Sequence, residues 1–325
     1  METRRITKEN FFAILGAGDR PWQDDYLVMY SSVWPGFTTD PDLMLVPIDD
    51  HLVHRGDGVF EVIRCIQGNI YQLDGHLERL EKSAKAISLR LSTDYSDIKE
   101  IIKTLVSIGR EKNCLIKVVL SRGPGSFGVN PYDCPESQIY ANVIRFRGVP
   151  EEFHTKGVSL ITSRIPVKKS FFATIKSCNY LPNVLMKMEA IDAGFQFAVA
   201  LDEEGFLAEG PTENIGVLTE DNVMIFPRFE RTLSGITANR VFQLAHILIE
   251  EKMIKAVKFD KVLPDDAYRA REIFLTGTSI DVLPVVIYDK KKIGGGIPGP
   301  VCSKLRELLQ HDMTMNQDIL TKVDL

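Results

Sequence analysis

The stretch ATIKSCNYLPN, residues 173–183, places one lysine, Lys176, among apolar and small residues. It lies between a predicted strand at residues 158–165 and a predicted helix that begins near Leu181 and covers about residues 182–193. Partial burial lowers the pKa of a lysine and so favours the free amine that attacks a carbonyl carbon. Lys176 is therefore a candidate for covalent catalysis.

A second stretch, FLAEGPTENI at residues 206–215, follows further along the chain. Its first four residues predict one strand of a hairpin, and Glu209 stands at the end of that strand, before a Gly-Pro turn. Taken alone, a glutamate there is a polar strand end, just as a lone lysine is usually a solvated surface residue. Only the combination of the two stretches indicates a catalytic site.

Periodicity predicts strands and helices on both sides of these stretches. Apolar residues recur at helical spacing over residues 76–88, 97–108 and 236–252. Strands, several of them joined by hairpin turns, are predicted at residues 59–64, 70–73, 115–120, 139–146, 197–201, 206–209 and 215–218. Frequent hairpins favour an α+β fold with mixed sheets over a doubly wound parallel fold. The polar segment 147–152, broken by Gly and Pro, predicts a linker between a smaller N-terminal α/β domain, residues 1–146, and a larger C-terminal domain, residues 153–325.

Composition and charge exclude several classes of function. The net charge of -5 and the pI of about 5.8 give no general attraction for nucleic acid or for an anionic membrane. The five cysteines are scattered, with no C-x-x-C pair, which argues against a disulfide framework or a zinc site and favours a cytoplasmic protein. His51 and His54 lack partners for a metal site. No signal peptide and no apolar run of about 18 residues is present, so we expect neither secretion nor membrane insertion.

Lys176 and Glu209 lie in two motifs that resemble the signature of class IV aminotransferases, which have the fold type IV architecture. This family includes branched-chain aminotransferases, D-amino acid aminotransferases and aminodeoxychorismate lyase. Further segments resemble the family in the same order along roughly residues 45–310: GDGVFEVIR at 56–64, HLERL at 76–80, LSGIT at 233–237, LTGTS at 275–279 with VLPV at 282–285, and GIPGPV at 296–301. The resemblance implies a two-domain fold of the D-amino acid aminotransferase type, with mixed sheets and flanking helices.

The same resemblance implies pyridoxal 5'-phosphate as cofactor, held by Lys176 as a Schiff base. Lys176 would also act as the base that moves the α proton of the substrate, and Glu209 would keep the pyridine nitrogen protonated so that the ring withdraws electrons. Tyr180 would contact the phenolic oxygen of the ring. A phosphate needs positive charge and oriented N–H donors, and the residues implied for it are Arg79, Gly235, Ile236, Thr237 and Thr278.

For the substrate, the resemblance implies an apolar pocket and a carboxylate-binding turn. Its residues are Phe60, Val62, Phe127, Val129, Thr278 and Ser279. In related enzymes the loop at residues 123–131 reaches the active site of the partner subunit, which implies a homodimer. The expected reaction is transfer of an amino group from an apolar, branched-chain-like L-amino acid to a 2-oxo acid such as 2-oxoglutarate.

Three alternatives stay open at this point. D-amino acid aminotransferases carry an Arg and a His in the loop where this chain has Ser126, Phe127 and Val129, which counts against D-amino acids. Branched-chain enzymes carry a tyrosine and an arginine where this chain has Leu115 and Lys117, which counts against branched-chain specificity as well. The reaction of aminodeoxychorismate lyase is the second alternative. A non-catalytic relative would have lost the lysine or the glutamate, and this chain keeps both.

Overall fold

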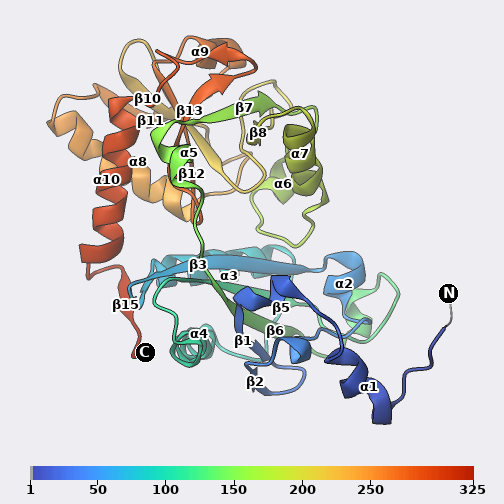
Figure 1. Ribbon diagram of the computed structural model, residues 1–325. Helices are drawn as coiled ribbons and strands as arrows, with labels where there is room; N and C mark the ends of the chain where they lie inside the picture. The colour runs from blue at the N-terminus through green and yellow to red at the C-terminus, as the bar shows by residue number, and fades with distance from the viewer. Residues whose placement is uncertain (1–2) are drawn as a thin grey trace.

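The computed structural model describes residues 3–325 and arranges the strands in two sheets, one above the other in Figure 1. The first sheet has seven strands in the order β15-β4-β3-β5-β6-β1-β2, all paired antiparallel. They are β1 (Tyr26–Ser31), β2 (Gly36–Thr38), β3 (Gly58–Ile66), β4 (Asn69–Tyr71), β5 (Cys114–Ser121), β6 (Gln138–Arg145) and β15 (Leu320–Lys322).

Two helices, α3 (Leu73–Ala86) and α4 (Tyr95–Gly109), cover one face of the first sheet. Their apolar residues recur every three to four positions, and this stripe packs on alternate residues of β3 and β5 such as Ile63 and Ile116. Because strand residues alternate between faces, Phe60 and Val62 lie on the opposite face of β3. Shorter helices occupy the connections: α1 (Lys8–Leu15), α2 (His51–Arg55) and the 3-10 turns η1 (Pro21–Asp25), η2 (Pro41–Leu43) and η3 (Pro131–Asp133).

The second sheet has eight strands and mixed pairing, as predicted. Its order is β11-β10-β9-β12-β13-β7-β8, with β14 paired to β13. The strands are β7 (Val158–Thr162), β8 (Phe197–Val199), β9 (Asn214–Leu218), β10 (Val223–Phe226), β11 (Ala256–Phe259), β12 (Glu272–Gly277), β13 (Asp281–Tyr288) and β14 (Lys291–Lys292). The helices of this part are α5 (Glu151–Thr155), α6 (Ser170–Ala173), α7 (Leu181–Asp192), α8 (Ile236–Glu250), α9 (Pro264–Tyr268) and α10 (Pro300–Met315).

The strand predicted at residues 206–209 is wrong as a regular strand. Only isolated bridges form there, Leu201 with Leu207 and Glu209 with Asn214. The segment nevertheless pairs with residues 200–202 as the expected hairpin, since the amide of Ala208 donates to Ala200 and the amides of Ala200 and Asp202 donate to Glu209 and Phe206. The pairing covers too few residues for a regular strand, and Glu209 ends the segment as expected. The other predicted elements are present, with their ends shifted by up to a few residues.

The chain ends on the first sheet rather than the second. After α10, the strand β15 pairs with the edge strand β4, in the register Leu320 to Tyr71. Figure 1 shows this return below α10. The expected assignment of residues 153–325 to one C-terminal domain departs from the structure at this strand. Three residues carry no periodicity, so the return has no signal in the sequence.

No helix within residues 3–325 is both long enough and apolar enough to cross a membrane.

Candidate active site

Lys176 lies on a short segment that pairs with the first residues of β3, on the side where β4 does not reach. The amide of Phe60 donates to the carbonyl of Lys176 at 3.0 Å, and the amide of Cys178 donates to the carbonyl of Gly58 at 2.9 Å. Val59 and Ser177 form an antiparallel bridge between these bonds. The lysine segment, which connects α6 to α7 of the second part, is therefore fixed to the first sheet, and the lysine sits where the two parts meet.

The environment of Lys176 favours its free amine. Burial lowers the pKa of Lys176 to about 8, with help from the charge of Arg79 and opposition from Glu61 and Glu209. Its ammonium nitrogen lies 4.8 Å from the centre of the Phe60 ring. Near neutral pH a useful fraction of the amine is therefore unprotonated and can act as a nucleophile or a base.

Glu209 lies in the same slot as Lys176 and Tyr180, with Leu233 as an apolar wall. The Glu209 carboxylate is buried and accepts one hydrogen bond, from the amide of Leu233 at 2.9 Å. Burial raises the pKa of Glu209 to about 7, against that hydrogen bond and the charges of nearby lysines. A carboxylate with spare acceptor capacity in such a place suits a cationic N–H group of a bound molecule.

Arg79 connects α3 with the loop before α8. Its Nε and Nη2 donate to the carboxylate of Glu61 at 2.7 and 2.8 Å, and its Nη1 donates to the carbonyl of Ser234 at 2.8 Å. A guanidinium has five N–H groups, so two remain free beside the loop. Those two N–H groups are available to an anion.

The start of α8 offers a second set of donors to an anion. Gly235 is the N-cap, and the amides of Ile236 and Thr237 in the first turn have no acceptor within the helix. A Cβ on Gly235 would lie 1.9 Å from Oδ1 of Asn214, so only glycine fits against that side chain. With Arg79 beside it, this helix end could hold an anion such as a phosphate, and the two together are called the anion cradle below.

Sequence reasoning missed Glu61 and His76. Glu61 is fully buried, and it also accepts a hydrogen bond from Nδ1 of His76 at 2.7 Å. Burial alone would raise the pKa of Glu61, but the charge and hydrogen bonds of Arg79, together with His76, lower it to about 2. Alternation along β3 could have revealed this residue, because Glu61 shares the helix-covered face with Val59 and Ile63, where a charge needs a partner.

Thr278 and Ser279 occupy the turn between β12 and β13 and are half-buried. Just after the turn, the carboxylate of Asp281 pairs with the guanidinium of Arg64 on β3. This ion pair holds the turn beside the strand that carries Phe60 and Val62. Phe60 packs edge-to-face on Tyr180, with ring centres 5.1 Å apart.

Phe127 and Val129 lie outside this cluster. They are 63% and 80% exposed, at the tip of the loop after β5. The loop is held by α2, since Nε of Arg55 donates to the carbonyl of Gly128 at 3.0 Å and His54 stacks near Phe127 with ring centres 5.3 Å apart. A single chain thus leaves this part of the expected substrate pocket facing solvent.

Comparison with known proteins agrees with this geometry. The family model described as amino-transferase class IV matches residues 58–288. The chain belongs to the class IV aminotransferases. It is 41% identical to the chloroplastic D-amino-acid transaminase of Arabidopsis thaliana, over 89% of this chain and 77% of that protein. It is 31% identical to a putative branched-chain-amino-acid aminotransferase of Methanocaldococcus jannaschii, over 81% of this chain and 89% of that protein.

Solved structures show the same fold type IV architecture in other class IV aminotransferases. The crystal structure of a T.th. branched-chain amino acid aminotransferase with pyridoxamine 5'-phosphate matches with a TM-score of 0.85 and 29% identity, over 92% of this chain and 99% of that one. Class IV aminotransferases depend on pyridoxal 5'-phosphate. The residues of this chain fit that cofactor, because an amine and a buried carboxylate line one slot and the anion cradle begins at Ser234, the residue after Leu233 in the slot lining.

Proposed function

We propose that this aminotransferase moves the amino group of an apolar, branched-chain-like L-amino acid to a 2-oxo acid such as 2-oxoglutarate. The observation that carries the proposal is the slot in which the amine of Lys176, with its lowered pKa, lies with the buried carboxylate of Glu209. Phe60 and Val62 support an apolar side chain, since both lie in an apolar cluster on the face of β3 opposite α3 and α4.

Each residue around the slot has a role in this proposal. Pyridoxal 5'-phosphate, when bound, supplies an electron-withdrawing ring that stabilises negative charge at the α carbon of the substrate. Lys176 would hold the cofactor covalently and would then carry the proton removed from that α carbon on Nζ. Glu209 would accept a hydrogen bond from the protonated pyridine nitrogen, and the hydroxyl of Tyr180 would contact the phenolic oxygen. The lowered pKa of Lys176 suits a base that works near neutral pH.

The anion cradle is assigned to the phosphate of the cofactor. Arg79 contributes its two free N–H groups. The other proposed contacts are Gly235, Ile236, Thr237 and Thr278. Ser279, with the hydroxyl of Thr278, is proposed to bind the α-carboxylate of the substrate at the turn held by the Arg64–Asp281 pair.

A second candidate is transamination of D-amino acids. It is favoured by the 41% identity to a relative named a D-amino-acid transaminase. Against it, the loop at residues 123–131 contains no histidine and no arginine, and it carries Phe127 and Val129 instead. A carboxylate clamp in that loop would need charged donors.

Three incubations distinguish the candidate reactions. The holoenzyme is given L-leucine, D-alanine or aminodeoxychorismate, the two amino acids with 2-oxoglutarate, and glutamate and pyruvate are followed. We expect glutamate from L-leucine, with isoleucine and valine at comparable rates, because apolar pockets discriminate by only about 1–3 kcal/mol per methylene. Reaction with D-alanine alone would select the second candidate. Pyruvate from aminodeoxychorismate, with no reaction of leucine, would make the protein a lyase.

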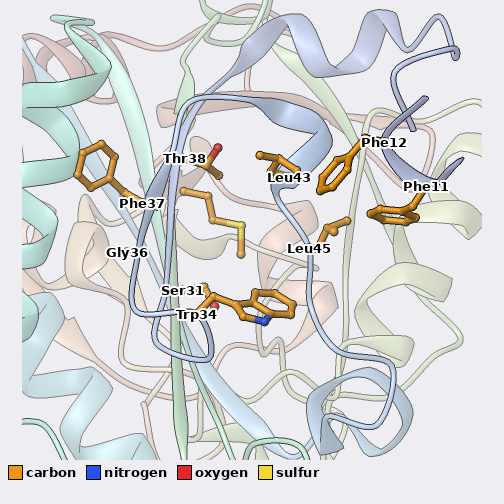
Figure 2. A pocket seen from close by; sticks show the side chains of 10 residues that line it. Phe11, Phe12, Ser31, Trp34, Gly36, Phe37, Thr38, Leu43 and Leu45 are labelled. Carbon is orange, nitrogen blue, oxygen red and sulfur yellow. The ribbon is translucent and has the colours of Figure 1, made fainter. Parts of the chain in front are cut away.

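We further propose that two copies of the chain form a homodimer in which the 123–131 loop completes the partner's substrate pocket. Exposed apolar side chains support it. A hollow of about 470 Å³ lies between α1 and the β1–β2 hairpin. Phe12, Leu43 and Trp34 lie around it (Figure 2). Further exposed apolar side chains lie in the segment after the hollow and in and beside the loop: Leu45, Val46, Ile48, Val53, Phe127, Val129 and Tyr132. Exposed apolar side chains in such number are typical of a subunit interface.

A complementation experiment tests the shared pocket. Lys176→Ala removes the amine, and the double variant Phe127→Asp and Val129→Asp disables the loop. Neither homodimer should be active, whereas refolding the two together should restore activity, because a mixed dimer contains one site with an intact lysine and an intact partner loop. Absence of recovery in mixed dimers that are shown to form would place the loop in its own subunit's site. We also propose a cytoplasmic location, which the free state of all five cysteines supports.

A further inference from the structure

Two cysteines of the first sheet, Cys65 on β3 and Cys114 on β5, stand directly opposite each other in the antiparallel register. Opposite residues of an antiparallel pair project to the same face, with their Cα atoms about 4.5 or 5.5 Å apart. A disulfide requires a Cα separation of about 4.4–6.8 Å. The backbone therefore already holds the two cysteines at a distance that a disulfide can span.

The two thiols also share their surroundings. Both are free and fully buried, in the apolar cluster between the first sheet and the helices α3 and α4. Cys302 is buried in a different cluster, and Cys134 and Cys178 are half-buried in loops. Register and shared burial therefore single out Cys65 and Cys114 as one unit.

The two thiols differ in acidity, because one donates a hydrogen bond to the other. The hydrogen bond from the thiol of Cys114 lowers the pKa of Cys65, against the effect of burial, and the same bond raises the pKa of Cys114. The thiolate is the form of cysteine that attacks an oxidant. Cys65 is therefore suited to react first, and Cys114 is suited to attack the product on its neighbour.

The C-terminal segment, residues 320–325, closes one end of the layer that contains the pair. The amide of Val323 donates at 3.1 Å to the carbonyl of Gly68, in the turn that follows β3. The hydroxyl of Ser107 on α4 donates at 2.6 Å to the carbonyl of Asp324 (Figure 1). Val323 belongs to the same apolar cluster as both cysteines. Chain ends that few bonds hold open more readily than a core, so this segment can admit a small molecule to the pair.

We propose that Cys65 and Cys114 are an oxidation site, at which hydrogen peroxide converts the two thiols into a disulfide between β3 and β5, with the C-terminal segment as the gate. The sulfur of Cys65 attacks the O–O bond and becomes a sulfenic acid, and the other oxygen leaves as water. The sulfur of Cys114 then attacks that of Cys65. The S–S bond forms, the S–O bond breaks, and the hydroxyl leaves with the proton of Cys114 as a second water. Two thiols together lose two electrons, and one peroxide gains them.

Peptide mapping of the holoenzyme tests the proposal. The protein is treated with hydrogen peroxide, alkylated in denaturant and digested without a reductant. We expect a cross-linked peptide that contains residues 65 and 114, about 2 Da lighter than its two thiol peptides together. Dithiothreitol should separate it, as expected for a transient disulfide of a reducing compartment. The oxidised protein should also have a higher melting temperature, because the cross-link restricts the unfolded chain.

Four variants test the order of the steps and the gate. Cys114→Ala should accumulate the sulfenic acid on Cys65, which a 1,3-diketone traps, whereas Cys134→Ala should form the cross-link as the native protein does. Ser107→Ala loosens the C-terminal segment and should form the cross-link faster. As a matched control, Ser303→Ala removes an exposed hydroxyl that donates to the carbonyl of Gly299 on α10, and it should leave the rate unchanged.

Several outcomes would overturn the proposal. Peroxide that oxidises Cys134 and leaves both Cys65 and Cys114 as thiols would reject the site, and so would a cross-link between other cysteines. No trapped sulfenic acid on Cys65 in Cys114→Ala would reject the order of attack. Equal rates in Ser107→Ala and the native protein would reject the C-terminal segment as the gate. None of these measurements requires a substrate, so they are independent of the proposed transamination.

Discussion

The carboxylate of Glu61 holds the guanidinium of Arg79 by two hydrogen bonds, from Nε at 2.7 Å and from Nη2 at 2.8 Å. Glu61 is fully buried on β3, and Arg79 projects from α3 toward the loop before α8. The pair therefore fixes the one arginine of the anion cradle in a defined orientation. Removal of either residue leaves the charge of the other buried and without its partner.

Glu61→Gln should destabilise the protein strongly. Removing one partner of a buried ion pair costs about 3–5 kcal/mol, because the other charge stays behind without compensation. A phosphate would supply that compensation, so pyridoxal 5'-phosphate should raise the melting temperature of the variant more than that of the native protein. Differential scanning calorimetry with and without cofactor measures both effects. As a matched control, Glu81→Gln breaks an exposed pair with Lys85 and should cost less than about 1 kcal/mol.

The stability that the Glu61–Arg79 pair contributes should be lost only at low pH. The pKa of Glu61 is lowered to about 2 by Arg79 and His76, against burial. A carboxyl whose pKa is lowered by folding contributes stability above its unfolded pKa of about 4.3, and that stability is lost as the pH falls toward 2. Urea unfolding at stepped pH should show this loss in the native protein. In Glu61→Gln the slope between pH 4 and pH 2 should be smaller, and an identical slope would remove Glu61 from the acid response.

Lys176 should capture the cofactor in a pH-dependent manner. With its pKa lowered to about 8, the free amine fraction of Lys176 increases as the pH rises and levels off above that value. The rate at which the apoprotein captures pyridoxal, which lacks the phosphate, should follow this curve. Borohydride trapping and peptide mapping should place the adduct on Lys176. An adduct on Lys168, Lys169 or Lys187 would assign covalent attachment elsewhere.

Glu209→Gln should retain the cofactor and lose turnover. The phosphate contacts remain in the variant, whereas the pyridine nitrogen loses an ionised acceptor. One charged hydrogen bond is worth about 1.5–3 kcal/mol, which corresponds to about a 10- to 100-fold lower rate. Single-turnover absorbance changes measure the chemical step separately from binding. Native turnover in this variant would exclude Glu209 from the mechanism.

Gly235→Ala should weaken binding of the phosphate group. The added Cβ would lie 1.9 Å from Oδ1 of Asn214, so the loop before α8 must move, and overpacking of this kind costs about 1–3 kcal/mol. The affinity for pyridoxal 5'-phosphate should fall while that for pyridoxal stays the same. Adding Asn214→Ala removes the clashing atom and should recover part of the loss, with Asn214→Ala alone as the control. Equal losses for both forms of the cofactor would point to a general disturbance of the slot.

Much of the local structure could be predicted because its causes are local. The helical spacing of Leu77 and Leu80 predicted α3, and the apolar run at residues 115–120 predicted β5. The difference lies at residues 206–209, where the hairpin with residues 200–202 is too short to count as a regular strand. Alternation along β3 places Glu61 on the covered face, but its two partners, His76 and Arg79, approach it only after α3 packs on β3.

The sequence by itself determined the family, the candidate lysine and carboxylate, and the class of fold, because short motifs and periodic apolar residues record those directly. Only the tertiary structure decided that the Lys176 segment pairs with β3, that Arg79 is held by Glu61, and that Lys168 faces the slot while Lys169 does not. It also decided that the last strand returns to the first sheet. These relationships join segments far apart in the chain. Hydrogen bonds and ion pairs between such segments depend on how whole elements pack, and no local pattern of residues specifies them.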